Sequence, residues 1–328
     1  MNQEMLTDIM NNTPSGAWDL ILKSLWKIMS PPIDKNHAEA KVTERDIIVG
    51  EIDNLLSGSA WELWNELEYS PLKTSSMLKE FWKNNEYKAI LILDALSLRE
   101  VPWILEQGEI RGYSITNSIA TLSEVPGDTT TFAKAVGFGQ RSNLANNGGT
   151  SDFFPNAWTE SLGLPFADCS TLIKAQPSVF FWHHWPDNLL HIHADEGNGS
   201  RNLTKTVVET LISDDFWALL DKLSTGRKLI ITGDHGYANS GLFHTLHDKE
   251  QNDYMKNLFR SGRFVLNSFS EDHCWVPPLT VQQNKHSLAL GRRKWKSQGG
   301  YPTLVHGGLS LLEIAVPFIE IIKKTKNR

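Results

Sequence analysis

The sequence contains little cysteine and no long apolar segment. Only two of its 328 residues are cysteines, Cys169 and Cys274, too few for a disulfide framework or a four-cysteine zinc site. A reducing, intracellular setting is therefore expected. Residues 1–19 lack the basic start and apolar stretch of a secretory signal, and no run approaches the roughly eighteen apolar residues of a spanning helix. These absences predict a cytoplasmic protein without membrane contact.

Charge of neither sign dominates the chain. It has 32 Lys and Arg against 38 Asp and Glu, a net charge of −6. That balance argues against a surface coated in nucleic acid but leaves room for a local basic patch. The 23 glycines and 14 prolines exclude collagen-like and low-complexity chains. With 40% hydrophobic residues, the chain can bury a core of one large or two modest domains.

The hydrophobic pattern changes character near residue 87. Before it, apolar residues recur at helical spacing, as from Trp18 to Met29, and five of the twelve tryptophans fall there. After it come short apolar runs typical of buried strands, at residues 89–93, 113–119, 178–182, 228–232 and 264–266. Helical stretches separate several of these runs. The pattern predicts a helical N-terminal cap over residues 1–86 and a three-layer α/β/α domain over residues 87–328.

Acidic and imidazole side chains follow the predicted strands. Functional groups of open α/β sheets collect at the carboxyl ends of the strands. Asp and His without Cys suit Zn²⁺ or Mn²⁺. Each residue alone has an ordinary structural explanation, since a strand-end Asp is commonly a helix cap. The ordered set favours a two-metal site, which consists of Asp94, Asp187, His191, Asp234, His235 and His306.

Three segments resemble the PglZ family of the alkaline phosphatase superfamily. They are residues 92–96 (ILDAL), 231–236 (ITGDHG) and 306–313 (HGGLSLLE), and the resemblance covers roughly residues 86–322. It implies an alkaline-phosphatase-like fold with two divalent metal ions, Zn or Mn/Mg. It also implies a phosphohydrolase, either a phosphatase or a nuclease-like phosphodiesterase, that acts on a phosphate ester such as a nucleotide or nucleic acid. PglZ proteins occur in BREX phage-defence systems, so other defence proteins are expected partners.

The resemblance also implies roles for individual residues. One metal would take Asp187, His191 and His306, with His183, His184 and His193 as alternatives to His191. The other would take Asp94, Asp234, His235 and the nucleophile oxygen. Pro126 and Gly139 have the family's spacing around Thr129, the expected nucleophile, although Thr130 and Thr131 stay open.

Two features depart from the family pattern. Ser97 occupies the position where PglZ-like proteins usually have Arg, and Arg99 comes two residues later. The chain also lacks the large flanking domains of many family members. The alternative interpretation is therefore a catalytically degenerate PglZ domain that serves as a scaffold or regulator.

A basic segment precedes the last motif. Between residues 273 and 312 lie five Lys and Arg and neither Asp nor Glu. A solvated loop is one explanation. The other is a substrate entrance, because Trp295 among cations suits stacking on a base or sugar. This second interpretation predicts phosphate contacts from Arg292, Arg293 and Lys294.

Overall fold

A six-stranded mixed sheet forms the centre of the computed structural model, which describes residues 3–70, 72–83, 86–194, 199–266, 275–283 and 285–324. The strand order is β2-β13-β5-β1-β4-β3, and β13 runs opposite to the other five strands of this sheet. The strands are β1 (Lys88–Leu93), β2 (Tyr113–Leu122), β3 (Trp158–Leu162), β4 (Val179–His183), β5 (Lys228–Thr232) and β13 (Ala315–Lys323).

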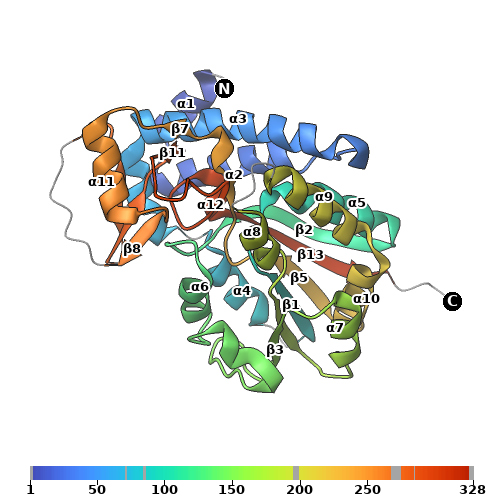
Figure 1. The fold of residues 1–328 in the computed structure, drawn as a ribbon. Helices are drawn as coiled ribbons and strands as arrows, with labels where there is room; N and C mark the ends of the chain where they lie inside the picture. The colour runs from blue at the N-terminus through green and yellow to red at the C-terminus, as the bar shows by residue number, and fades with distance from the viewer. Residues whose placement is uncertain are drawn as a thin grey trace.

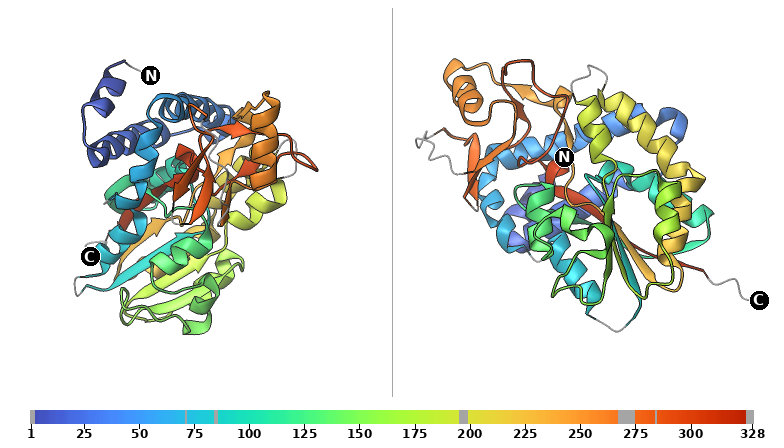
Figure 2. Two further views of the ribbon diagram at one scale, coloured as in Figure 1. Left: turned by 90° about the vertical axis from the view of Figure 1, so that its left-hand side faces the viewer. Right: turned by 60° about the horizontal axis from the view of Figure 1, so that its bottom comes forward.

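Alternate residues of the central strands enter two separate cores, as the two-residue period of a strand requires. Leu91 and Leu93 belong to one core and Ile90 and Ile92 to the other. Helices cover both faces (Figure 2). The first face packs on α2 (Pro14–Met29), α5 (Val101–Ile110), α7 (Phe166–Leu172), α9 (Gly199–Ile212) and α10 (Asp214–Ser224). The second packs on α4 (Thr74–Trp82), α6 (Thr129–Ala135) and η4 (Arg141–Asn147). The predicted three-layer α/β/α class is confirmed.

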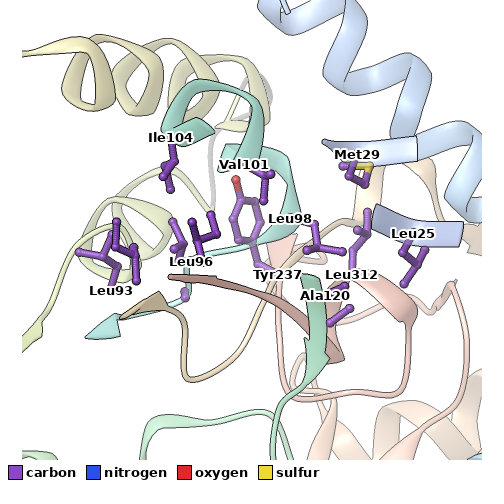
Figure 3. Packing of buried hydrophobic residues seen from close by; sticks show 14 of the residues in the cluster. Leu25, Met29, Leu93, Leu96, Leu98, Val101, Ile104, Ala120, Tyr237 and Leu312 are labelled. Carbon is purple, nitrogen blue, oxygen red and sulfur yellow. The ribbon is translucent and has the colours of Figure 1, made fainter. Parts of the chain in front are cut away.

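The predicted N-terminal helices form, and they share a core with the sheet. They include α1 (Gln3–Met10), α2, α3 (Ala38–Ser59), η2 (Trp61–Tyr69) and α4, with the short η1 (Lys35–His37) before α3. Leu25 and Met29 of α2 pack near Leu98 and Leu312 (Figure 3). The Trp18 and Trp64 rings lie edge to face at 5.2 Å, so aromatic packing helps to hold these helices together.

Residues between β5 and β13 build a small lobe beside the sheet. It contains β6 (Ala238–Asn239), η5 (Ser240–Leu242), β7 (His244–Thr245), α11 (Lys249–Phe259), β8 (Phe264–Leu266), β9 (Thr280–Gln283), β10 (His286–Ala289), β11 (Arg293–Lys294) and β12 (Leu304–Val305). Figure 1 shows α11 and β8 at one side of the molecule, away from α7 and α10. Residues 264–266, expected in the main sheet, instead pair with β10 in a three-stranded sheet.

Three short elements complete the fold: η3 (Leu98–Glu100), α8 (Asp187–His193) and α12 (Leu311–Ile314). Cys274 and His273 lie outside the described residues. Among the residues that the structure describes, no helix has both the length and the apolar character to cross a membrane.

Candidate metal centre

The carboxyl ends of three parallel strands meet at one point. Asp94 follows β1, Asp234 and His235 follow β5, and Asp187 begins α8 shortly after β4. Backbone hydrogen bonds join these ends: Asp94 N donates to His183 O at 3.0 Å, and Asp187 N donates to Asp94 O at 3.0 Å. The Ala95 N–H donates to Asp234 Oδ1 at 2.9 Å. The placement predicted from the strand ends is therefore present.

Two glycines of the ITGDHG segment allow the backbone to pass close to its neighbours. A Cβ on Gly233 would lie 2.5 Å from Leu96 O, and one on Gly236 would lie 2.3 Å from Leu312 O. Both distances are too short for any side chain, and the obstructing atoms belong to the backbone. Gly233 and Gly236 thus let Asp234 and His235 lie between the β1 turn and α12.

The HGGLSLLE segment folds around the carboxylate of Glu313. Glu313 accepts hydrogen bonds from Arg263 Nε (2.7 Å), Gly308 N (2.9 Å) and Ser310 Oγ (2.7 Å), and both charged side chains are buried. A Cβ on Gly308 would lie 2.5 Å from Arg263 Nε. The segment therefore fixes the backbone that carries His306. The ring of His306 stacks on His235 with centroids 4.4 Å apart.

Five ligand-type residues form two groups of three that share one member. In the first, one ligand atom each from Asp187, His235 and His306 lies within 4.8 Å of the others. In the second, Asp94, Asp234 and His235 satisfy the same condition. Asp94, Asp234 and His235 are at most 1% exposed. This arrangement matches five of the six residues predicted from the sequence, and His235 belongs to both groups.

Two buried carboxylate oxygens of the centre, Asp187 Oδ1 and Asp234 Oδ2, have no hydrogen-bond partner. An unpartnered buried carboxylate oxygen is costly unless a proton or a cation balances it. Carboxylate and imidazole together are suitable ligands for Zn²⁺ and Mn²⁺. The donor set and its unsatisfied oxygens therefore fit divalent metal ions.

The electrostatics of the centre support the same assignment. Burial and the nearby Asp94 charge raise the pKa of Asp234 to about 7. Burial alone would lower the pKa of His235, but Asp234 and Asp94 raise it to about 10. Burial and the adjacent His235 lower the pKa of His306 to about 4. Protons on Asp234 and His235 thus offset negative charge that a bound cation could offset instead. Metal binding at such groups releases the protons.

His191, the sixth predicted ligand, lies at the margin. Its Nε2 is 3.2 Å from Asp187 Oδ2, and its side chain is 62% exposed. The ring centroids of His191 and His306 are 5.8 Å apart. His183 is an unsuitable replacement, because Leu164 O and the Trp185 N–H occupy its two ring nitrogens. The Nε2 of His184 contacts Ser161 Oγ at 3.1 Å.

Of the three consecutive threonines, Thr129 contacts the centre. Its Oγ1 donates to Asp94, at 3.2 Å from Oδ1 and 3.4 Å from Oδ2. Thr131 has a local structural role, because Asp128 caps α6 by accepting hydrogen bonds from the Thr131 N–H and hydroxyl, both at 2.9 Å. The geometry is consistent with the predicted choice of Thr129.

Arg141 is a site residue that the sequence argument missed. Its Nη1 forms an ion pair with Asp94 Oδ2, and its side chain is 28% exposed. The Asp94 carboxylate therefore contacts Thr129 and Arg141 together. The available sequence signal was weak: Arg141 is one of two cations in the Gly-, Thr- and Asn-rich segment 124–152, and nothing in its spacing points to Asp94.

The structure contradicts the predicted basic entrance at Arg292 and Trp295, whose side chains are buried. Arg292 is 3% exposed, and its Nε donates to Asp53 Oδ2 at 2.8 Å. Trp295 is 1% exposed. Arg293 Nη1 donates to Pro278 O at 2.9 Å, and Lys294 Nζ donates to Ser240 O at 3.0 Å. Arg292 is therefore unavailable for a phosphate contact, whereas Arg293 and Lys294 are half-buried and Lys285 and Lys296 are exposed.

Arg99, the arginine nearest the family's Arg position, is also engaged elsewhere. It is 3% exposed, its Nε lies 3.1 Å from both Asp46 carboxylate oxygens, and its Nη2 lies 2.8 Å from Asp46 Oδ2. A buried, paired guanidinium has no donors to offer a phosphate. In this structure Arg141 is the guanidinium at the centre.

Comparison with known proteins gives structural matches only. The sequence matches no protein-family model and no curated protein. Murine ectonucleotide pyrophosphatase/phosphodiesterase 5 matches with a TM-score of 0.42 and 13% identity, over 72% of this chain and 88% of that one. The human protein gives 0.40 and 10%, over 72% and 87%. Phosphonoacetate hydrolase from Sinorhizobium meliloti gives 0.38 and 11%, over 73% and 90%.

Proposed function

We propose that this chain is a divalent-metal-dependent phosphohydrolase, a phosphodiesterase or phosphatase. The observation that carries the proposal is the pair of three-residue groups that share His235, with the Thr129 hydroxyl hydrogen-bonded to Asp94. A hydroxyl next to two divalent-ion sites is the arrangement needed to attack phosphorus and to stabilise the leaving oxygen.

The proposed metal ligands fall into two sets, one for each ion. Asp187, His306 and the adjoining His191 would hold one ion, and Asp94, Asp234 and His235 would hold the other. The bound ions, Zn²⁺ or Mn²⁺/Mg²⁺, would supply positive charge at the attacking and leaving oxygens. Thr129 is held at the centre by its hydrogen bond to Asp94.

Two displacements complete the reaction. Thr129 Oγ1 forms a bond to phosphorus while the bond to the departing alkoxide breaks, and the alcohol takes up the hydroxyl proton overall. Water then cleaves the phosphothreonine and restores the hydroxyl. This step releases phosphate when the substrate is a monoester and a phosphomonoester when it is a diester. Arg141 lies beside the same carboxylate, so its guanidinium would face the phosphate oxygens during both steps.

The biological setting is also a proposal. The segments ILDAL, ITGDHG and HGGLSLLE support a PglZ-type protein of the alkaline phosphatase superfamily. We infer from that resemblance a cytoplasmic role in phage defence, together with other defence-system proteins. The ordered ligand set favours catalysis over a degenerate scaffold, because buried carboxylate oxygens that accept no hydrogen bond are costly and bring a scaffold no benefit.

Asp234→Asn tests the proposal, because the change keeps the shape of the side chain and removes its charge. We expect the wild type to bind two Mn²⁺ or Zn²⁺ ions and to hydrolyse a chromogenic phosphate mono- or diester. Asp234→Asn should bind fewer ions and lose at least about 100-fold in kcat/KM. Asp215→Asn, at an exposed position on α10, is the control. A wild type that binds no divalent ion would overturn the proposal and favour the scaffold.

A further inference from the structure

Two adjoining cavities lie at the amino-terminal end of the parallel strands, opposite the candidate metal centre. Their volumes are about 710 and 500 Å³, and both are lined by Tyr87, Thr225, Gly226 and Arg227. They continue into one another around Arg227, and we call the combined feature the Arg227 groove. The six residues of β1 lie between this end of the sheet and Asp94, a length of roughly 20 Å. In Figure 1 the groove belongs to the side of the molecule that carries α7, α10 and the end of β13.

Arg227 places a buried positive charge at the junction of the cavities. It is 7% exposed, and it donates to the carbonyl oxygens of Gln176 (2.9 Å from Nε) and Lys222 (3.0 Å from Nη1). Among the described residues no carboxylate forms an ion pair with it. Carbonyl dipoles satisfy its hydrogen bonds but carry no net charge. The groove therefore has a positive floor whose counter-charge the described part of the chain does not provide.

Lysines extend this positive charge along the groove. Lys174 and Lys222 line the first cavity, and Lys228, Lys323 and Lys324 line the second. Two of the five are neutralised locally: Lys228 pairs with Glu86 at 2.8 Å, and Lys323 pairs with Asp221. In the described residues Lys174, Lys222 and Lys324 have no such partner, and all three are exposed. An acidic protein thus presents an extended basic groove.

Tyr87 adds an apolar contact at the middle of the groove. Its side chain is 62% exposed, and it lines both cavities. An exposed aromatic ring between separated cations offers a surface on which a planar base can stack, while the cations meet phosphates on either side. A single phosphate would use only one part of such a groove, and an acidic peptide would leave the ring without a stacking partner.

We propose that the Arg227 groove binds single-stranded nucleic acid, with its phosphates along Lys174, Lys222 and Lys324 and a base on Tyr87. The binding surface is separate from the metal centre and does not depend on hydrolysis. It replaces the predicted surface at residues 292–294, where the structure shows Arg292 buried and paired. The groove would hold a strand on the body of the protein at a distance from the centre.

Fluorescence anisotropy with a labelled oligothymidylate of about 12 nucleotides tests the groove. The groove variant is the full chain with Lys174→Glu, Lys222→Glu and Lys324→Glu together. The matched control carries Lys35→Glu, Lys249→Glu and Lys256→Glu, which change the net charge equally at exposed positions elsewhere. We expect wild-type affinity to fall as salt rises, and the groove variant to bind at least tenfold more weakly. Three lost phosphate contacts should reduce the slope of log K against log salt by about 2.

Tyr87→Ala provides the second measurement, because an exposed ring can be removed without opening the core. Its affinity for the oligonucleotide should fall about tenfold with an unchanged salt slope. Circular dichroism confirms the fold of each variant, and hydrolysis of a small chromogenic ester should be the same in all of them. That comparison separates failure of the groove from failure of the proposed function.

Three results would overturn the proposal. The first is that the control variant weakens binding as much as the groove variant does. The second is that the wild type fails to bind at low salt. The third is that polyglutamate displaces the oligonucleotide at equal charge concentration. The last result would assign the groove to acidic polymers in general. Competition by inorganic phosphate at constant ionic strength separates occupation by a single phosphate from binding of a strand.

Discussion

The Asp94 carboxylate is fully buried. It accepts a hydrogen bond from Thr129 and forms an ion pair with Arg141. A carboxylate with two such partners is already partly neutralised. A cation that binds there must compete with the guanidinium but not with the hydroxyl, which can turn. Thr129 and Arg141 are therefore expected to respond differently to substitution.

Thr129→Ala should leave metal content unchanged and lower the hydrolysis rate by at least about 1,000-fold, because the attacking oxygen is removed. Thr129→Ser should retain much of the rate. The measurement is single-turnover hydrolysis together with metal analysis. Thr131→Ala is the control, since its hydroxyl serves only the cap from Asp128. If Thr129→Ala keeps the wild-type rate, Thr130 becomes the candidate nucleophile.

Arg141→Ala should separate metal binding from catalysis. Removal of the guanidinium eliminates a competitor for Asp94, so the affinity for Mn²⁺ should stay the same or increase. The value of kcat/KM should fall about 10- to 100-fold, because a charge-assisted contact to the phosphate is lost. Arg141→Lys should recover part of it. A variant that loses metal affinity and activity together would show instead that Arg141 maintains the shape of the centre.

The residues of the centre were partly readable from the sequence. Asp94, Asp234 and His235 follow apolar strands directly, and the strand register determines where they lie. Arg141 could not be found in this way, because it reaches Asp94 from η4, a 3₁₀ segment that follows α6 in the chain. No periodicity governs such a contact. The same limitation made Arg292 look free, since its partner Asp53 is 239 residues away.

At the scale of elements, buried ion pairs connect α3 to the parts of the chain around the centre. Asp53 accepts hydrogen bonds from Arg292 Nε at 2.8 Å and from the Leu311 N–H at the start of α12 at 2.7 Å. Asp46 of the same helix binds Arg99 of η3. Loss of one member of such a pair leaves the other charge buried without compensation.

Asp53→Asn should therefore lower the free energy of unfolding by about 3–5 kcal/mol. Urea denaturation followed by tryptophan fluorescence measures this change. The double variant Asp53→Asn/Arg292→Met should be more stable than the single one, because the stranded charge is gone. Asp19→Asn breaks the exposed pair with Lys23 and should change the stability by less than about 1 kcal/mol. An equal effect of Asp53→Asn and Asp19→Asn would contradict the argument.

Element prediction succeeded where the pattern was regular and local. The alternating cores of β1, β4 and β5 follow from continuous apolar runs, and α2 follows from its helical spacing. The small lobe was harder, because β6, β7, β11 and β12 have only two residues each. Strands this short carry no period, and long-range pairing determines them. For that reason residues 264–266 were assigned to the wrong sheet.

At the scale of the whole molecule, the candidate metal centre joins parts that are distant in the chain. Its candidate ligands follow β1, β4 and β5, and His306 comes from the loop before α12, which Arg263 of the lobe holds through Glu313. A divalent ion bound to this set would connect the sheet, α8 and the lobe at once. Because the unfolded chain lacks a preformed site, metal binding should stabilise the entire fold.

Mn²⁺ at about 100 times its dissociation constant should add about 2.7 kcal/mol to the free energy of unfolding, which corresponds to a rise of about 4 °C in Tm. The gain should depend on pH. Asp234 has a raised pKa of about 7 in the metal-free fold, so it binds a proton as pH falls through that value. The proton competes with the metal, and the Tm rise at a fixed Mn²⁺ concentration should be smaller at pH 6 than at pH 8. Differential scanning fluorimetry with Mn²⁺ and with excess chelator measures both effects. In Asp234→Asn the rise should shrink and its pH dependence should weaken, whereas Asp215→Asn should behave as the wild type. An equal rise in all three proteins would mean that Mn²⁺ binds elsewhere.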